Sequence, residues 1–225
     1  MRRRGLGTVT IGQAPRSDLV PILDRYLPAD VRQTHCGVLD DLARAEIDAL
    51  YRPEPSEPAL VTRLLDGSAV TLSRARIERA VQDKIDALTE TGCSVILLLC
   101  TGSFANLSCR TAWLVEPDAI IPPLAAALVQ HRRLGVIVPL AAQIDSESGK
   151  WRALRQPPLF ASASPYDEDP AAVTEAARAL AARGAAALLL DCIGFTERHR
   201  EAAGASGLPV LLSNAIVAKT VGELL

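Results

Sequence analysis

Two cysteines, one in each half of the chain, follow short runs of apolar residues. Residues 95–102 read VILLLCTG and residues 187–194 read ALLLDCIG, so Cys100 and Cys192 each come at the end of such a run, two residues before a glycine. A thiolate is a base and a nucleophile, whereas the neutral thiol is an acid. If the two halves face each other, one thiolate can remove a proton from a substrate carbon while the other thiol returns one. We therefore take Cys100 and Cys192 as candidate catalytic residues.

The groups around these cysteines suit a small carboxylate substrate. A carbon next to a carboxylate is a weak acid, so the charge that develops on it needs several fixed donors, each worth ~3–4 kcal/mol. Backbone N–H groups after each cysteine, the hydroxyls of Thr101 and Ser103, and an arginine clamp can supply them. The candidate substrate-binding residues are Gln13, Arg16, Thr101, Gly102, Ser103, Ile193, Gly194 and Asn214.

The elements that must position these residues alternate along the chain. Both apolar runs are too short for helices and follow helix-stop pairs, Thr91-Gly92 and Arg183-Gly184, which indicates buried strands of a parallel sheet. Ligands bind at the carboxyl ends of such strands. We expect a helix near 104–109 and another near 197–203, and a helix N-terminus lowers the pKa of a nearby thiol.

The pattern predicts an α/β protein built twice. We expect two pseudo-symmetric lobes, 1–118 with Cys100 and 119–225 with Cys192, each with a parallel sheet flanked by helices and with the active site between them. The last helix, after Ser213, is a candidate to pack on the first lobe. A small strand-turn-strand insertion is expected around Asp66-Gly67, and a helix from Gln143 to Arg155.

Several further residues have two interpretations. Asp191 either orients the Cys192 turn or caps the next helix. Glu197 and His199 either assist Cys192 or lie on a solvated helix face. Cys36 ends another strand-like run and is a third thiol that can face the same cleft.

Composition narrows the class of partner. Hydrophobic residues make up 49% and charged residues 22% of the 225 residues, as in ordinary globular proteins. Aromatic residues at 4% and a net charge of -2 argue against nucleic acid or anionic lipid as partners. No apolar run approaches the ~20 residues that cross a bilayer. The basic segment Met1–Arg4 precedes a predicted strand and turn rather than a leader, so we expect a cytoplasmic protein. The cysteine spacing predicts no metal site.

A set of short segments spread through most of the chain resembles the AroM family, within the aspartate/glutamate racemase superfamily. The segments are Thr10–Gly12, Pro15, Ile120–Pro123, Gly135–Pro139, Lys150-Trp151, Leu190–Phe195, Arg198–Arg200 and Pro209–Asn214. The superfamily link rests mainly on the two cysteine turns. The resemblance implies two lobes, no organic cofactor and a homodimer as the possible assembly.

The resemblance also implies the chemistry of the two thiols. Racemases of the superfamily use two cysteines as acid and base, which Cys100 and Cys192 match, so a cofactor-independent racemase or isomerase of a small carboxylic acid is our first expectation. Some relatives use one cysteine, so a decarboxylase or cis–trans isomerase relying on Cys192 is an alternative. A third possibility is a non-catalytic binder of a small carboxylate.

Overall fold

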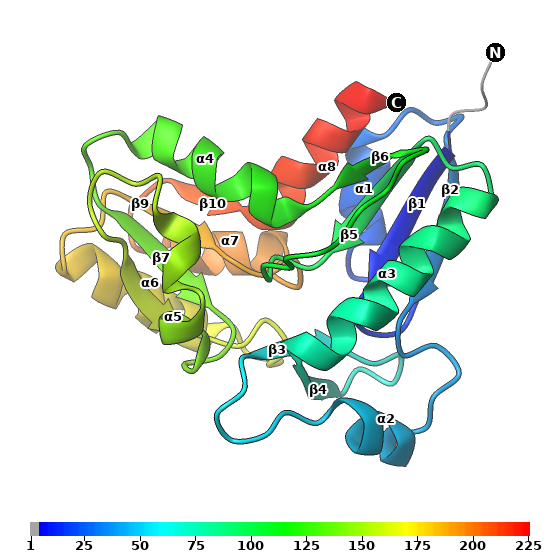
Figure 1. Ribbon diagram of the computed structural model, residues 1–225. Helices are drawn as coiled ribbons and strands as arrows, with labels where there is room; N and C mark the ends of the chain where they lie inside the picture. Colours follow the sequence, from blue (N-terminus) through cyan, green and yellow to red (C-terminus); the bar gives the residue numbers. More distant parts are fainter. Residues whose placement is uncertain (1–4) are drawn as a thin grey trace. The chain divides into compact units, whose positions relative to one another are not determined.

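The chain divides into two compact α/β units. The computed structural model describes residues 5–225, so the basic segment Met1–Arg4 lies outside the described residues. Residues 5–117 together with 217–225 form the first unit, and Asp118–Ile216 forms the second. Each unit has its own parallel sheet with helices beside it (Figure 1). The predicted α/β class, with two parallel sheets flanked by helices, is confirmed.

The sheet of the first unit has four parallel strands in the order β2-β1-β5-β6. Their bounds are β1 Gly5–Thr10, β2 Arg32–Gly37, β5 Val95–Leu99 and β6 Trp113–Val115. Every residue of β1 and β5, the two central strands, is buried. A parallel strand covered on both faces needs apolar or small residues at every position, which is why β5 is a continuous apolar run.

Helices and a hairpin also belong to this unit. They are α1 Val20–Tyr26, α2 Arg44–Tyr51, α3 Arg74–Glu90, and the antiparallel pair β3 Ala59–Arg63 and β4 Ala69–Ser73. The hairpin around Asp66-Gly67 is therefore confirmed. Helix α3 lies across one face of the sheet (Figure 1). It buries Ile77, Val81, Ile85 and Leu88, one helical stripe, against the core.

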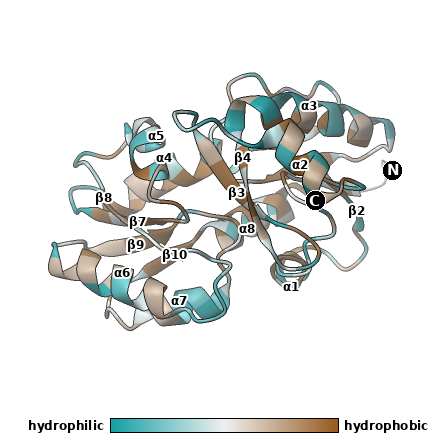
Figure 2. Ribbon diagram, turned by 90° about the horizontal axis from the view of Figure 1, so that it is seen from below, coloured by the Kyte–Doolittle hydropathy of each residue, from teal (hydrophilic) through white to brown (hydrophobic). Residues whose placement is uncertain are grey.

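The second unit repeats the first in the order of its strands. Its parallel strands β7 Leu134–Val138, β8 Leu159–Ser162, β9 Ala187–Leu190 and β10 Val210–Leu212 lie in the order β8-β7-β9-β10. Its helices are α4 Pro117–Val129, α5 Gln143–Ser146, the 3₁₀-helix η1 Ser148–Trp151, α6 Ala171–Ala182, α7 Glu197–Gly204 and α8 Ser213–Leu224. The second half of α8 belongs to the first unit. Helices α6 and α7 lie on one face of this sheet and α4 on the other (Figure 2).

The two cysteine strands occupy equivalent positions in the two sheets. Written in sequence order, β1, β2, β5 and β6 correspond to β7, β8, β9 and β10, so β5 corresponds to β9. The helix before each of these strands stops at a glycine, Gly92 with φ +79° and Gly184 with φ +90°. Only glycine adopts this left-handed conformation without strain, which explains both helix-stop pairs. Cys100 and Cys192 therefore follow the same strand of a repeated topology.

Two predicted helices are absent or shorter than expected. Residues 104–109 form an irregular loop between β5 and β6, so the expected helix is wrong there. Side chains of α3 accept hydrogen bonds from backbone N–H groups of this loop. These N–H groups are therefore satisfied without the hydrogen bonds of a helix. The helix expected from Gln143 to Arg155 is replaced by α5 and η1, two single turns.

The distribution of hydropathy follows this architecture. Strands β7, β9 and β10 carry mostly hydrophobic colours, and helices α2, α3 and α7 carry many hydrophilic ones (Figure 2). None of the helices formed by residues 5–225 is long and apolar enough to span a membrane.

Candidate functional site

Both candidate catalytic cysteines lie in turns of the same geometry. The N–H of Gly102 donates to the Cys100 sulfur at 3.4 Å, and the N–H of Gly194 donates to the Cys192 sulfur at 3.4 Å. Both cysteines are buried, 7% and 9% exposed. A hydrogen bond donated to sulfur favours the thiolate over the neutral thiol. Burial disfavours a thiolate, and in each turn the glycine N–H offsets part of that cost.

The expected contribution of helix N-termini differs between the two turns. No helix follows Cys100, because residues 103–112 are irregular. Helix α7 begins at Glu197 with Thr196 as its N-cap, beyond the Cys192 turn itself. The prediction of a helix start behind each cysteine is thus wrong for Cys100. A thiolate at these positions would be stabilised by the glycine N–H groups and not by the positive end of a helix dipole.

The Cys100 turn is packed against the β3–β4 hairpin. A Cβ atom added to Gly102 would lie 2.6 Å from Leu60 Cδ2 and 3.4 Å from the Cys100 sulfur. Leu60 is itself buried in β3, at 2% exposure. The turn therefore has no room for a side chain at position 102, and the hairpin fixes its shape from outside the sheet.

Helix α3 holds the loop that follows the Cys100 turn. Glu78 Oε1 accepts hydrogen bonds from the N–H groups of Ala105 and Asn106 at 2.9 and 2.8 Å, and from the Asn106 amide at 3.3 Å. Gln82, one helical turn on, accepts from the Ser108 N–H at 2.9 Å and donates to the Ser108 carbonyl at 2.9 Å. These bonds fix the backbone between β5 and β6.

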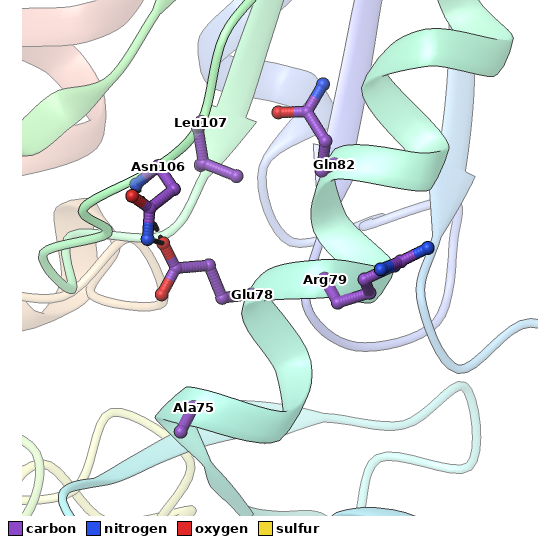
Figure 3. A pocket seen from close by; sticks show the side chains of 6 residues that line it. All are labelled: Ala75, Glu78, Arg79, Gln82, Asn106 and Leu107. Carbon is purple, nitrogen blue, oxygen red and sulfur yellow. Dashed lines mark hydrogen bonds between the residues drawn. The ribbon is translucent and has the colours of Figure 1, made fainter.

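A pocket of about 320 Å³ lies beside this loop, in the first unit. Ala75, Glu78, Arg79 and Gln82 of α3 line it together with Asn106 and Leu107 of the loop, and Glu78 and Asn106 point toward each other (Figure 3). It contains none of the residues that the sequence predicts for the site. Its polar side chains are largely used to hold the loop.

The residues predicted after β1 make contacts within the first unit. Gln13 donates to the carbonyls of Leu39 and Leu42 at 3.2 and 3.5 Å and accepts from the Leu65 N–H at 2.9 Å. Its carboxamide links three loops. Arg16 is buried, and its guanidinium makes two hydrogen bonds to the Asp18 carboxylate at 2.8 and 2.6 Å. A carboxylate thus already occupies one edge of this arginine.

Asn214 contacts the Cys192 turn directly. It lies near the start of α8 and is 4% exposed. Its amide nitrogen donates to the carbonyls of Ile193 and Phe195 at 3.1 and 2.6 Å. The predicted substrate-binding amide donor is therefore engaged with the backbone on both sides of Gly194.

Tyr166 covers the same turn from the loop after β8. A Cβ added to Gly194 would lie 2.7 Å from the Tyr166 hydroxyl oxygen and 2.9 Å from its ring carbons. Glycine at position 194 lets the phenol lie directly against the backbone. No local sequence pattern marks Tyr166, which is separated from the cysteine strand by the whole of α6.

Asp191, the residue before Cys192, belongs to a buried ion pair. Lys150 Nζ is 2.6 Å from Asp191 Oδ2, and the two side chains are 4% and 2% exposed. Burial lowers the pKa of the Lys150 ammonium, but the charges of Asp191, Glu147 and Asp118 outweigh burial and raise its pKa overall. Asp191 is thus bound to a lysine of η1. Of the two interpretations offered for it, the geometry favours orientation of the turn.

His199 is buried rather than solvated. Its Nδ1 atom accepts from the Thr196 N–H at 2.9 Å, which closes the N-terminal cap of α7. Its ring meets Phe195 edge to face at 5.4 Å between centroids. Burial, with a smaller contribution from Arg198, lowers its pKa to about 4. The interpretation of His199 as part of a solvated face is wrong, because the ring is 2% exposed.

The third thiol, Cys36, is poorly suited to acid–base chemistry. It lies within β2 and donates to the Thr8 carbonyl at 3.5 Å. Burial is the largest cause that raises its pKa to about 11, so it stays protonated at neutral pH. Within residues 5–225, no group of three or more His, Cys, Asp or Glu side chains is placed to hold a metal ion.

The predicted site residues gather as two clusters, one in each unit. In the first unit Gln13, Arg16 and 101–103 lie beyond the carboxyl ends of the adjacent strands β1 and β5. In the second unit Ile193, Gly194 and Asn214 lie at the carboxyl ends of the adjacent strands β9 and β10. Four residues from distant segments were not predicted for the site. Leu60 and Tyr166 pack against the two turns, Glu78 holds the loop after the first turn, and Lys150 pairs with Asp191.

Solved structures with the same fold cover nearly the whole chain. Glutamate racemase from Francisella tularensis in complex with D-glutamate is 14% identical, with a TM-score of 0.64, and the match covers 100% of this chain and 81% of that one. Aspartate racemase from Picrophilus torridus is also 14% identical, with a TM-score of 0.59 and coverage of 98% and 94%. A mutant of arylmalonate decarboxylase in the liganded form is 16% identical, with a TM-score of 0.59 and coverage of 98% and 91%.

These matches show that the chain shares the fold of these enzymes. No curated protein matches the sequence. The model of one protein family, described as AroM protein, matches residues 6–225. The chain therefore belongs to the AroM family.

Proposed function

We propose that this protein is a cofactor-independent racemase or isomerase of a small carboxylic acid, with Cys100 and Cys192 as its acid–base pair. The observation that carries the proposal is the repeated turn. At the same position of two equivalent sheets, a cysteine sulfur accepts a hydrogen bond from the N–H of the glycine two residues on. A single thiol at a strand end is often only a small buried side chain. The same sulfur contact in both units favours a shared chemical task.

The proposed reaction moves protons only. One cysteine, as thiolate, removes the proton from the carbon next to the substrate carboxylate and becomes a thiol. The electron pair of the broken C–H bond moves into the carboxylate, which becomes enediolate-like. The other cysteine, as thiol, then donates its proton to the opposite face of the same carbon. The donors proposed to hold the carboxylate are the backbone N–H groups of 101–103 and 193–194, the hydroxyls of Thr101 and Ser103, and Arg16.

The fold relatives support this class of reaction. Two of the solved structures are described as an aspartate racemase and a glutamate racemase, and a third as a decarboxylase of arylmalonate. All five cysteines of the chain are thiols, which suits the reducing cytoplasm where we propose that the protein works.

A proton-exchange screen tests the proposal. Small mono- and dicarboxylates are incubated with the protein in heavy water, and deuterium at the carbon next to the carboxylate is measured by NMR. We expect exchange and inversion with at least one substrate class, and loss of both in Cys100→Ser and in Cys192→Ser. Cys36→Ser is the matched control and should exchange like the native protein. A ligand that raises the melting temperature but never exchanges would instead favour a carboxylate-binding protein.

A single-cysteine reaction at Cys192 is the second candidate, as a decarboxylase or cis–trans isomerase. The observation in its favour is that two side chains from other segments contact the Cys192 turn. Asn214 binds its backbone carbonyls, and Tyr166 packs against Gly194. In this case Cys100→Ser would retain most of the turnover, whereas Cys192→Ser would lose it. The two serine variants therefore separate the two candidates.

A further inference from the structure

Asn214 is bound to a peptide group that contacts the Cys192 sulfur. Its amide nitrogen donates to the Ile193 carbonyl at 3.1 Å. The N–H of the same peptide group, which belongs to Gly194, donates to the Cys192 sulfur at 3.4 Å. Because a trans peptide group is planar and its C=O and N–H point in opposite directions, fixing the oxygen also fixes the direction of the N–H.

The second bond of Asn214 makes this orientation firm. The same nitrogen donates to the Phe195 carbonyl at 2.6 Å, so the carboxamide bridges the carbonyls before and after Gly194. Asn214 is 4% exposed, and α8, to which it belongs, begins one residue earlier at Ser213. The glycine that donates to sulfur is therefore held between two anchored carbonyls.

We propose that Asn214 is a positioning residue for Cys192, which orients and polarises the 193–194 peptide group so that its N–H stabilises the thiolate. A donor on the carbonyl oxygen draws electron density from the peptide and makes its N–H a stronger donor, since hydrogen bonds in a chain polarise one another. A stronger bond to the charged form of sulfur favours that form. Asn214 acts on the sulfur through the backbone.

The charged and titratable neighbours of this turn are the same in all the variants compared below. They are the Lys150–Asp191 pair with Glu147 and Asp118 around the lysine, Tyr166 against Gly194, and His199 against Phe195. A change at Asn214 adds no charge to this set. A change in the Cys192 pKa between the variants then reports on the peptide group between Ile193 and Gly194.

The role rests on the proposed function, because a stabilised thiolate matters only if Cys192 is the reacting group. The experiment therefore measures the sulfur and not turnover. Protein with isotopically labelled cysteine is titrated by NMR, and the Cβ resonance of each cysteine, assigned through single Cys→Ser variants, gives its pKa. If the proposed function is wrong, the Cys192 pKa and its dependence on Asn214 can still be as expected here. The two failures can therefore be told apart.

Asn214→Ala removes both donors. We expect it to raise the Cys192 pKa by about one unit, a tenfold change in the thiol–thiolate equilibrium, and to leave Cys100 where it was. Ser213→Ala is the matched control, because the Ser213 hydroxyl donates its buried hydrogen bond to the Leu190 carbonyl at 2.7 Å and not to the 193–195 backbone. It should leave the Cys192 pKa unchanged. An unchanged Cys192 pKa in Asn214→Ala, or an equal rise in Ser213→Ala, overturns the proposal.

A second measurement needs no variant at position 214. In the native protein the Gly194 amide proton should shift with the same pKa as the Cys192 Cβ resonance, and Cys192→Ser should abolish the shift. The Asn214 side-chain amide protons should be protected from exchange and should move with the same titration. A Gly194 amide that does not sense the Cys192 titration would also refute the positioning role.

Discussion

Lys150 reaches Asp191 through the interior of the second unit, with 2.6 Å between ammonium and carboxylate oxygen and almost no exposure of either side chain. Asp191 is the residue immediately before Cys192, so the pair ties the end of β9 to η1. Two charges removed from water are stable together only because each compensates the other. The pair therefore makes the position of the Cys192 turn depend on a residue of a distant single-turn helix.

Lys150→Met should destabilise the protein strongly. It leaves the Asp191 carboxylate buried without its cation, and breaking a buried pair on one side costs about 3–5 kcal/mol. Urea denaturation measures the free energy of unfolding. The double variant Lys150→Met with Asp191→Leu should recover part of the loss, because the carboxylate in direct contact with Lys150 is removed together with it, whereas Glu147 and Asp118 remain. Arg79→Met, which removes an exposed pair with Asp83 at 4.0 Å, is the control and should change stability little. Similar losses in the two single variants would contradict this account.

Gly102→Ala should destabilise the Cys100 turn by about 1–3 kcal/mol, because its methyl group overlaps Leu60. Leu60→Ala alone leaves a cavity in the core and costs about 2–5 kcal/mol. The two changes together should cost less than the sum of the single changes, because the cavity accepts the new methyl group. A double-mutant cycle from thermal or urea unfolding measures this coupling. Additive costs would show that the hairpin does not define the turn.

Glu78→Ala should release the loop between β5 and β6. It removes the acceptor of three hydrogen bonds from Ala105 and Asn106. Their amide groups should then exchange with solvent much faster, which hydrogen-exchange mass spectrometry of a peptide covering 103–112 detects. Arg79→Ala, at the neighbouring position of α3, is the matched control and should keep the native exchange rates. Unchanged protection in Glu78→Ala would mean that other contacts hold the loop.

The buried His199 should make stability fall in mild acid. Its pKa is lowered to about 4, whereas an unfolded histidine titrates near its ordinary value of 6.5. Between these values the unfolded chain binds the extra proton, so stability is complete above the unfolded pKa and declines as pH falls toward about 4. The decline is up to about 3 kcal/mol.

His199→Gln provides the comparison for this pH dependence. Glutamine offers a neutral acceptor for the Thr196 N–H and does not titrate. Unfolding free energies measured across the acid range should therefore vary less in the variant than in the native protein. Identical pH profiles would show that other groups cause the acid sensitivity.

The parts of the fold that could be predicted from the sequence are those with local signals. Continuous apolar residues in 95–99 and 187–190 specify strands buried on both faces, and Gly92 and Gly184 mark the helix ends before them. Asp66-Gly67 specifies the hairpin turn between β3 and β4. These features depend on residues a few positions apart, so the sequence pattern is sufficient.

The parts that could not be predicted depend on side-chain contacts between distant segments. Residues 104–109 have no helix because Glu78 and Gln82, on another element, satisfy the loop backbone. Asn214 was expected to face a substrate, and its amide instead binds two backbone carbonyls. Nothing in the local sequence distinguishes an amide that binds a ligand from one that binds a turn. Such assignments need the coordinates of both partners.

The first unit is assembled from both ends of the described chain, with the second unit as an uninterrupted segment within it. Gly222 packs on the Tyr26 backbone, and Lys219 lies 5.1 Å from the Tyr26 ring. During synthesis, residues 217–225 therefore leave the ribosome after every part of the second unit. The second unit can reach its native structure before residues 217–225 are available to the first unit, so maturation of the Cys100 half waits for this segment.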